Sequence, residues 1–409
     1  MAVLYQISIH FFILFLRIIS LFNQKVRIGL EGRKNWISEL EDIPKDAQVI
    51  WFHCASLGEF DQGLPVMHAL KNNTPNAFIL VTFFPPSGMV HYDKRTHPVD
   101  QALYLPFDTK INALTFIRKA KPKLAIFVKY EFWPNFILEC RASNVKLISI
   151  STLLRKNQIY FKGYGGFFAR VLKNIDYFFV QNEETKSLLE SIGIRNTEVS
   201  GDTRFDNVLL NKEANASTHS ILSNFTAQGP VLIAGSSWAS EEKIVKEFLV
   251  SNPETKVIIA PHNVNKSNVS RIETLLDLPV TRYTEFNEEH VERILILDTM
   301  GQLSSAYQYA DYALIGGGFS GSLHNILEAG AYGLPVFFGP HHQKFPEAQS
   351  FIDGGIGFAI ENAEQLSEKM NTLGDQQELK QKIESFMKSQ AGATDKIVNH
   401  SFTTNSLKP

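Results

Sequence analysis

Residues 310–340 read ADYALIGGGFSGSLHNILEAGAYGLPVFFGP and set the pattern on which the rest of the chain is built. An apolar run at 312–315 ends in glycines, a helix-like run opens near His324 and Asn325, and a second apolar run follows at 336–338. This order predicts a strand, a glycine loop, a helix and a second strand. Glycines let the backbone pass close to a ligand and a helix start offers free N–H groups, so we expect the unit to bind an anion such as a nucleotide phosphate.

Short apolar runs alternate with longer amphipathic stretches along the whole chain, which indicates parallel β–α units. The runs expected to form strands are 49–52, 78–82, 102–105, 124–128, 146–150, 177–180 and 198–200 in the first half, and 231–234, 257–260, 294–297, 312–315, 336–338 and 357–360 in the second. The fold class predicted is α/β, with two tandem Rossmann-like domains and a ligand cleft between the carboxyl ends of their sheets.

The composition fits a folded protein of two domains. The chain has 409 residues, of which 44% are hydrophobic and 20% charged, and its formal net charge of −2 gives no general attraction to nucleic acid. Only two cysteines occur, Cys54 and Cys140, which argues against a disulfide framework. The predicted division is an apolar membrane-anchor helix at 1–23, an N-terminal domain at 24–206, a polar linker at 207–228, a C-terminal domain at 229–385 and a C-terminal helix or tail at 386–409.

The first 22 residues are almost wholly apolar, interrupted by His10 and Arg17. They lack the charge order and the small residues of a cleaved signal peptide, so we expect the segment to be retained. It could span a bilayer, but a helix lying in the membrane interface fits at least as well because Arg17 is costly at the membrane centre. A buried first helix is the alternative. Basic residues after the segment favour a cytoplasmic location for the body of the protein.

Three charged residues in the first half are candidates for catalysis. Glu59 follows a glycine at a predicted strand-to-helix turn, where it could act as a general base. Glu131 follows another strand, and Arg204 could supply positive charge to a leaving phosphate. Each also has a structural interpretation: Glu59 as a carboxylate at a helix N-terminus, and Arg204 as an ion-pair partner.

The loops after the strands of the second half are rich in glycine and short polar residues, as expected of a ligand rim. Gly316, Gly318 and Gly321 satisfy G-x-G-x-x-G, but no acidic residue ends the next strand, which disfavours a nicotinamide site. Glu328 shares a helical face with Asn325 and could reach a ribose hydroxyl or could complement the helix dipole.

Two further features bear on partners and metals. The basic and aromatic stretch at 153–173 suits an amphiphile with an anionic head or a membrane surface, and the near-neutral chain disfavours its rival, single-stranded nucleic acid. The pair His341 and His342 has no third ligand at a recognisable spacing, so no metal site is predicted.

Taken together, the motifs resemble those of the Kdo transferases, which move 3-deoxy-D-manno-octulosonic acid (Kdo) from CMP-Kdo to a lipid A precursor. The matching segments are the apolar N-terminus, Ala55-Ser56-Leu57-Gly58-Glu59, Thr82 with Pro86-Ser87-Gly88, Glu131-Phe132-Trp133-Pro134-Asn135, Gly201-Asp202-Thr203-Arg204-Phe205-Asp206, Asp298-Thr299-Met300-Gly301 and the glycine loop with Asn325 to Glu328. They cover almost the whole chain in the family's order.

The resemblance implies an inverting glycosyltransferase of GT-B architecture at the cytoplasmic face of the inner membrane, in lipopolysaccharide biosynthesis. Glu59 would be the base, Glu131 and Arg204 would stabilise the transition state, and domain closure would complete the site. The implied contacts of the CMP moiety are Pro261, His262, Met300, Gly301, Gln302, Asn325, Ile326, Leu327 and Glu328. No cofactor or metal is implied.

Three positions depart from the family pattern: Arg204 stands where lysine is usual, Gln302 where glutamate is usual and His262 where arginine is usual. Three alternative functions remain at this point. The first is a GT-B transferase that uses a UDP-sugar and a lipid acceptor, the second is a sugar-nucleotide epimerase, and the third is a non-catalytic membrane-bound lectin-like module. The number of Kdo units transferred and the oligomeric state cannot be read from the sequence.

Overall fold

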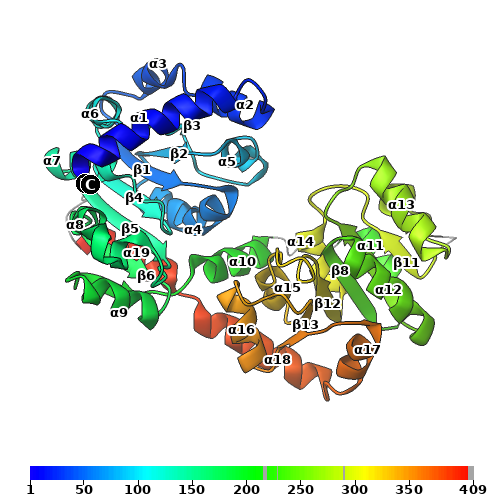
Figure 1. The fold of residues 1–409 in the computed structure, drawn as a ribbon. Coiled ribbons are helices and arrows are strands. Elements are labelled where there is room, and N and C mark those ends of the chain that lie inside the picture. Colours follow the sequence, from blue (N-terminus) through cyan, green and yellow to red (C-terminus); the bar gives the residue numbers. More distant parts are fainter. Residues whose placement is uncertain (215–218, 228, 289–290, 404–409) are drawn as a thin grey trace. The chain divides into compact units, whose positions relative to one another are not determined.

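A computed structural model describes residues 1–214, 219–227, 229–288 and 291–403. The chain forms two compact units, of which the first comprises Met1–Asn207 with Ala391–Pro409 and the second comprises Val208–Gln390 (Figure 1). Within the predicted linker, residues 215–218 and 228 lie outside the described residues, and helical segments occupy much of the rest.

The first unit contains a parallel sheet of seven strands in the order β3-β2-β1-β4-β5-β6-β7. The strands are β1 Gln48–Cys54, β2 Ala77–Phe83, β3 Gln101–Tyr104, β4 Leu124–Val128, β5 Lys146–Thr152, β6 Tyr177–Val180 and β7 Thr197–Val199, and each overlaps a predicted run. Side chains alternate along β1, so that Trp51 belongs to one hydrophobic core and Ile50 and Phe52 to another. A sheet buried on both faces explains why the runs read as continuously apolar.

The helices of the first unit precede, connect or follow these parallel strands. They are α1 Ala2–Ile19, α2 Gln24–Glu31, α3 Trp36–Glu39, α4 Leu57–Asn73, α5 Pro86–Met89, α6 Lys110–Ala120, α7 Pro134–Ala142, α8 Gly166–Leu172, α9 Glu183–Ser191, α10 Thr203–Ala214, which runs into the second unit, and α19 Ala393–Thr403. Short 3-10 turns are η1 Leu40–Asp42, η2 Tyr92–Lys94, η3 Ile159–Phe161 and η4 Gly163–Gly165.

The second unit repeats the architecture, with a parallel sheet in the order β10-β11-β9-β8-β12-β13-β14. Its strands are β8 Val231–Ser237, β9 Lys256–Pro261, β10 Thr281–Arg282, β11 Ile294–Ile296, β12 Tyr312–Ile315, β13 Val336–Phe338 and β14 Gly357–Ala359. Its helices are α11 Ser220–Thr226, α12 Ala239–Ser251, α13 Lys266–Leu276, α14 Leu303–Ala306, α15 Leu327–Ala331, α16 Pro346–Asp353, α17 Ala363–Asn371 and α18 Gln376–Gln390, with turns η5 Tyr283–Glu285 and η6 Tyr307–Tyr309. The sequence missed β10, a two-residue edge strand.

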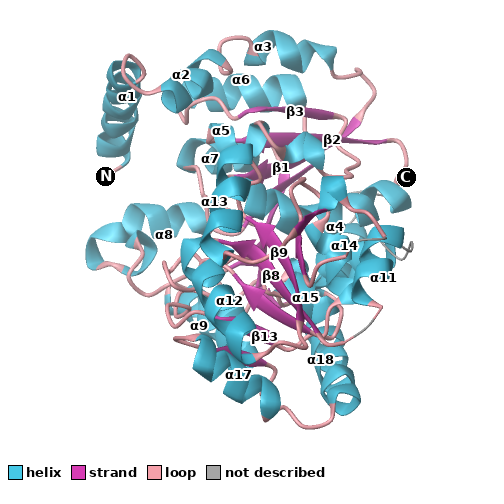
Figure 2. Cartoon of the chain, turned by 90° about the vertical axis from the view of Figure 1, so that its right-hand side faces the viewer, coloured by secondary structure: helices cyan, strands magenta, loops and turns pink. Residues whose placement is uncertain are grey.

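Helix α1 lies along the margin of the first unit and exposes most of its surface (Figure 2). One face is docked: the Tyr5 hydroxyl donates to Asp108 Oδ2 at 2.5 Å, Gln6 Nε2 donates to Asn135 Oδ1 at 2.7 Å, and Ile9 is the buried residue of the helix. The helix is long and apolar enough to cross a membrane, with 6% of its apolar window buried. The alternative of a buried first helix is therefore wrong.

The C-terminal helix α19 belongs to the first unit, among elements coloured cyan and green in Figure 1. Ile397 and Val398 pack in the same core as helix α4. The Asp206 carboxylate accepts hydrogen bonds from the backbone N–H groups of Gly392 at 2.6 Å and Thr394 at 2.8 Å, and from the Thr394 hydroxyl. The sequence had placed 386–409 beyond the second domain as a helix or tail, whereas residues 391–403 return to the first. Residues 404–409 lie outside the described part.

We predict that Asp206→Ala loosens α19. The change removes three charge-assisted hydrogen bonds at the start of the helix, and loss of such a cap costs about 2 kcal/mol. Amide hydrogen exchange should rise across 393–401, and the unfolding temperature of the first unit should fall by roughly 5 °C. Asp395→Ala is the matched control, because Asp395 is exposed in the first turn of the same helix. Equal exchange in both variants would show that Asp206 does not hold α19.

Candidate functional site

In each unit, the strand order reverses between two neighbouring strands, and such a reversal opens a crevice at the carboxyl ends of a parallel sheet. In the first unit the reversal lies between β1 and β4, which lead into the loops that carry Glu59 and Glu131. In the second it lies between β8 and β12, which lead to Trp238 and the glycine loop at 316–326. The predicted site residues therefore follow strands at or next to these reversal points.

Glu59 occupies the first turn of α4, where Ser56 caps the helix. Its side chain folds back so that its Oε2 accepts a hydrogen bond from the Ala55 backbone N–H. The residue is only 4% exposed. Burial raises the pKa of Glu59 to about 8, against the opposing effect of the Ala55 N–H; nearby Glu131 adds to the rise and Lys129 opposes it. A carboxyl group that titrates near neutral pH is suited to move a proton in a reaction.

Glu131 is held by two ring nitrogens. Trp133 Nε1 donates to Glu131 Oε2 at 3.2 Å, and His53 Nε2 lies 3.1 Å from the same oxygen. His53 is buried, and its Nδ1 lies 3.0 Å from the Thr82 hydroxyl. These contacts fix the carboxylate while its side chain stays 31% exposed. The sequence analysis assigned no role to His53. Its position near the carboxyl end of β1, at the same sheet edge as Glu131, is the feature that could have indicated one.

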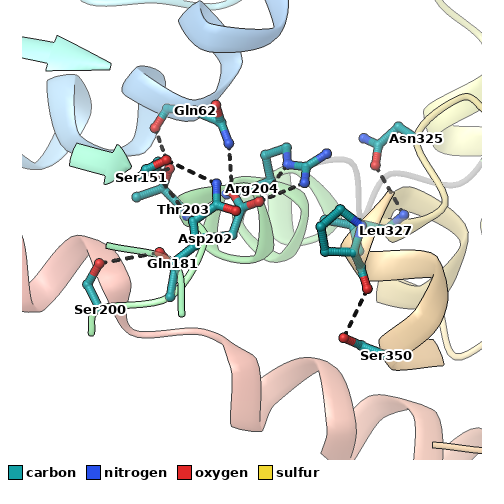
Figure 3. A network of polar contacts seen from close by, with 12 residues as sticks. Gln62, Ser151, Gln181, Ser200, Asp202, Thr203, Arg204, Asn325, Leu327 and Ser350 are labelled. Carbon is teal, nitrogen blue, oxygen red and sulfur yellow. Dashed lines mark hydrogen bonds and ion pairs between the residues drawn. The ribbon is translucent and has the colours of Figure 1, made fainter. Parts of the chain in front are cut away.

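Arg204 is an ion-pair partner of Asp202, as its structural interpretation required. The guanidinium contacts Asp202 Oδ2 through Nε at 2.8 Å and through Nη2 at 2.7 Å (Figure 3). Burial acts to raise the pKa of Asp202, but the charge and hydrogen bonds of Arg204 and a bond from Gln62 hold it below its usual value. Thr203 adds a second tie to α4, because its hydroxyl donates to the Gln62 carbonyl at 2.6 Å. The motif therefore fixes Arg204 to the helix that carries Glu59.

The glycines of the second unit pack against protein backbone. A Cβ atom on Gly316 would lie 2.0 Å from the Ser236 carbonyl oxygen, and one on Gly318 would lie 2.4 Å from the Gly339 nitrogen. Gly317 adopts a φ of +85° and Gly321 one of +74°, which favour glycine. The expectation that these glycines serve close passage of a ligand is thus replaced by a structural reason at Gly316 and Gly318.

The helix after the glycine loop starts later than predicted. Residues 316–326 form turns and irregular backbone, and α15 begins at Leu327 and is five residues long. Asn325 organises this start, because its Oδ1 accepts from the Leu327 N–H and its Nδ2 donates to Glu328 Oε1, both at 3.1 Å. Asn325 lies before α15, so its contact with Glu328 is a hydrogen bond across the start of the helix in place of the shared helical face that the sequence predicted. Ile326 and Leu327 are fully buried, so their side chains cannot line a binding surface.

Three rings meet at the reversal point of the second unit. The Trp238 ring stacks on His262 with centroids 4.3 Å apart, and His262 lies 4.7 Å from His324. Trp238 Nε1 donates to His324 Nε2 at 3.1 Å. Burial, followed by the proximity of His262, lowers the pKa of His324. An aromatic group of this kind offers a face to a planar ring. His262 was predicted as a contact of the CMP moiety, and Trp238 and His324 belong to loops that were predicted to form the ligand rim.

The buried carboxylate of Glu241 ties Trp238 to the glycine loop. It accepts hydrogen bonds from the backbone N–H of Gly317 at 2.9 Å and of Trp238 at 3.1 Å. Burial raises the pKa of Glu241, and these N–H groups oppose the rise. The loops after β8 and β12 are therefore held as one piece.

The remaining residues that were predicted to contact the CMP moiety lie on neighbouring loops. Pro261 ends β9, directly before His262. Met300 is 71% exposed and Gly301 adopts a φ of +92°, and both follow β11, while Gln302 precedes α14. The structure places this loop beside the others along the sheet edge, since β11 adjoins β9.

The cysteines and histidines noted in the sequence are also placed. Cys54 and Cys140 are unpaired and buried, as predicted. Among the residues described, no group of three or more His, Cys, Asp or Glu side chains is arranged to hold a metal ion.

The chain is similar in sequence to known proteins. Residues 29–207 match the family model described as 3-Deoxy-D-manno-octulosonic-acid transferase (kdotransferase). A 3-deoxy-D-manno-octulosonic acid transferase of Rickettsia bellii is 27% identical over 382 residues, which cover 90% of this chain and 88% of the relative. A bifunctional glycosyltransferase/methyltransferase of Fusobacterium nucleatum is 25% identical over 84% of this chain, which spans about half of that relative (55%).

Solved structures share the two-domain fold. The UDP-GlcNAc 2-epimerase of Neisseria meningitidis, solved bound to UDP-GlcNAc, superimposes with a TM-score of 0.60 at 15% identity, over 87% of this chain and 99% of that one. The glycosyltransferase SnogD of Streptomyces nogalater gives a TM-score of 0.53 at 13% identity, over 89% and 100%. The architecture is that of GT-B enzymes. Residues 29–207 thus match the Kdo transferase family model, and the chain is similar to named Kdo transferases, which are glycosyltransferases, over most of its length.

Proposed function

We propose that the chain transfers Kdo from CMP-Kdo to a lipid A precursor at a membrane surface, with inversion at the anomeric carbon and release of CMP. The observation that carries the proposal is the Glu59 carboxyl group, which is buried at the reversal point of the first sheet and has its pKa raised to about 8. The family of the chain supports the sugar that is transferred.

In the proposed reaction, Glu59 accepts the proton of the acceptor hydroxyl group. The hydroxyl oxygen then forms a bond to the anomeric carbon of Kdo, while the bond from that carbon to the phosphate oxygen of CMP breaks and CMP leaves with the electron pair. Attack opposite to the leaving group inverts the carbon. Glu131, anchored by His53 and Trp133, stabilises positive charge that develops on the sugar.

Arg204 is proposed to offset the negative charge that develops on the leaving phosphate. Asp202 holds the guanidinium in a defined orientation, which reduces the reorganisation needed in the transition state. The donor held by the second unit must meet Glu59 of the first, so closure of the units is part of the proposal. No step requires a metal ion or a cofactor.

Donor binding is assigned to the second unit. The face of the Trp238, His262 and His324 group would receive the cytosine ring, and Glu328, oriented by Asn325, would accept a hydrogen bond from a ribose hydroxyl. His262 can supply a ring contact at the position where the family usually has arginine.

The acceptor and the location follow from the N-terminus. Helix α1 exposes apolar side chains along its free face, among them Val3 at 71% and Phe11 at 68%. A lipid acceptor reaches an enzyme most readily when that enzyme is attached to the membrane, and an amphipathic or apolar helix provides the attachment. Lys25 and Arg27, which follow this helix, favour the cytoplasmic face of the inner membrane.

We expect Glu59→Gln to lose turnover while it keeps donor binding. Loss of a general base lowers kcat by about 10²- to 10⁴-fold, and CMP affinity should change little because Glu59 is not a donor contact. The assay is radiolabel transfer from CMP-Kdo to a lipid A precursor, with calorimetric titration of CMP as the folding and binding control.

In the wild type, kcat/KM should rise about tenfold per pH unit until it levels near the pKa of about 8. Turnover within tenfold of wild type would remove Glu59 as the base.

Stability should also respond to this carboxyl group. Between the ordinary pKa of 4.5 and about 8, folded Glu59 keeps a proton that the unfolded chain has released. Its contribution to stability is therefore complete below pH 4.5 and is lost as the pH rises through 8, by about 1.4 kcal/mol per unit within that window. Glu59→Gln does not titrate, so its unfolding temperature should exceed that of the wild type at pH 8 by more than at pH 5. An equal difference at both pH values would contradict the raised pKa.

Titration with nucleotides tests the donor. We predict that the wild type binds CMP more tightly than UDP, and that Trp238→Ala weakens CMP binding about tenfold through loss of ring stacking. Trp238→Phe, which retains an aromatic face, is the matched control and should recover most of the affinity. Tight UDP binding without CMP binding would instead favour a UDP-sugar transferase or an epimerase.

A further inference from the structure

A cationic cavity lies where α1 meets the body of the first unit. Its volume is about 390 Å³, and it is lined by Arg17 of α1, by Arg33 and Lys34 after α2, and by Trp36, Phe107 and Asn112 among others. Of the described residues that line it, three are cations and none is acidic. A cavity with this charge selects an anion.

Arg33 is a fixed part of the wall. Its Nε donates to the Leu105 carbonyl at 2.8 Å and its Nη1 to the Gly29 carbonyl at 2.6 Å. Its Nη2 donates to the Phe84 backbone carbonyl. The guanidinium also lies over the Phe107 ring, 5.1 Å from its centroid. Burial lowers the pKa of Arg33 to about 10, so the group remains charged at neutral pH. Three carbonyl groups orient this charge but do not neutralise it.

Unlike Arg33, the other two cations that line the cavity are exposed to solvent. Arg17 and Lys34 are exposed, and no hydrogen bond or ion pair of their side chains is recorded among the residues that the structure describes. They come from separate elements and face one cavity, so their mutual repulsion is relieved when an anion binds between them.

The cavity borders the free apolar face of α1. Leu14 and Ile18, each 53% exposed, flank Arg17 in sequence, and Leu21 and Phe22 follow at 74% and 88%. When this face enters the acyl region of a membrane, the end of α1 that carries Arg17 lies at the depth of the headgroups. The ligand that matches both features has a phosphate group and an acyl chain.

We propose that this cavity binds the phosphate of an anionic phospholipid headgroup. The inference does not depend on the Kdo transfer proposed above. It does bear on that reaction, because Arg33 lies 4.6 Å from the Phe84 ring centroid and Phe84 packs against Trp133, which holds Glu131. A headgroup in the cavity would set the height of this part of the unit above the membrane.

The test is calorimetric titration of the full chain with dihexanoyl phosphatidylglycerol below its micelle concentration. Such monomers report the cavity without the charge of a vesicle surface. Dihexanoyl phosphatidylcholine and inorganic phosphate are the comparison ligands. We expect phosphatidylglycerol to bind at least tenfold more tightly than either. Equal affinity for phosphatidylcholine would overturn an anionic site, and equal affinity for inorganic phosphate would show a free-phosphate site in place of a lipid site.

Two double variants separate the cavity from general surface charge. Arg17→Gln with Lys34→Gln should weaken phosphatidylglycerol binding about 25-fold, at about fivefold for each cation. Lys25→Gln with Arg27→Gln removes the same charge from exposed positions on neighbouring α2, outside the described lining, and should change affinity less than twofold. Equal losses in the two variants would overturn the proposal. Lys34→Gln alone, which leaves α1 intact, should still lose about fivefold, and its unfolding temperature serves as the folding control.

Discussion

The reversal of strand order in a parallel sheet is the constraint on which both units depend. Parallel neighbours are joined by crossover connections, and in each unit the connections from the two strands at the reversal, β1 and β4 or β8 and β12, leave in opposite directions. The loops that follow these strands therefore diverge at the carboxyl edge of each sheet, where sheets of this kind bind ligands. The chain places Glu59 and Glu131 at one reversal, and Trp238 and His324 at the other.

Burial at these points is balanced by local hydrogen bonding, and the balance differs from one carboxyl group to another. Glu59 receives a backbone N–H from Ala55 but is close to Glu131, and its pKa is raised to about 8. Asp202 is also buried, yet its paired Arg204 keeps its pKa below the usual value. Two buried acids in one unit are thus assigned opposite states by their partners. Asp202 remains a charged anchor and Glu59 can exchange a proton.

The parts that could be predicted from the sequence are those set by local pattern. Continuous apolar runs located all strands but β10, because the sheets are buried between hydrophobic cores. The spacing of Asn325 and Glu328 indicated that they lie close together, although their hydrogen bond is made from the turn before the helix. The start of α15 was misjudged because the Asn325 side chain caps Leu327 after a turn, and a run of helix-forming letters does not show that turn.

Long-range contacts limited the prediction in other places. His53 contacts Glu131 across 78 positions of sequence, and Trp238 contacts His324 across 86. The return of α19 to the first unit depends on Asp206, which bonds to Thr394 across 188 positions. No local periodicity encodes such pairs, since they arise only when the sheet brings strand ends together. The residue types at strand ends indicated candidate site residues, but the sequence did not show which residues they contact.

A partly buried hydrogen bond attaches helix α1 to the body of the first unit. Tyr5 donates to Asp108, which also accepts from the backbone N–H groups of Asn135 and Phe136 at the start of α7. Burial raises the pKa of Asp108 to about 6, against the effect of these donors. A helix that crossed the bilayer as a separate rod would have to break this contact and leave a buried acceptor without its partner, which costs about 1–3 kcal/mol. One face of α1 contacts the first unit and the other is apolar. A helix that lies in the plane of the membrane interface keeps the first set of contacts and buries the apolar face in lipid. Under the proposed membrane attachment, this contact connects the lipid surface to the loop that carries Glu131, which directly precedes α7.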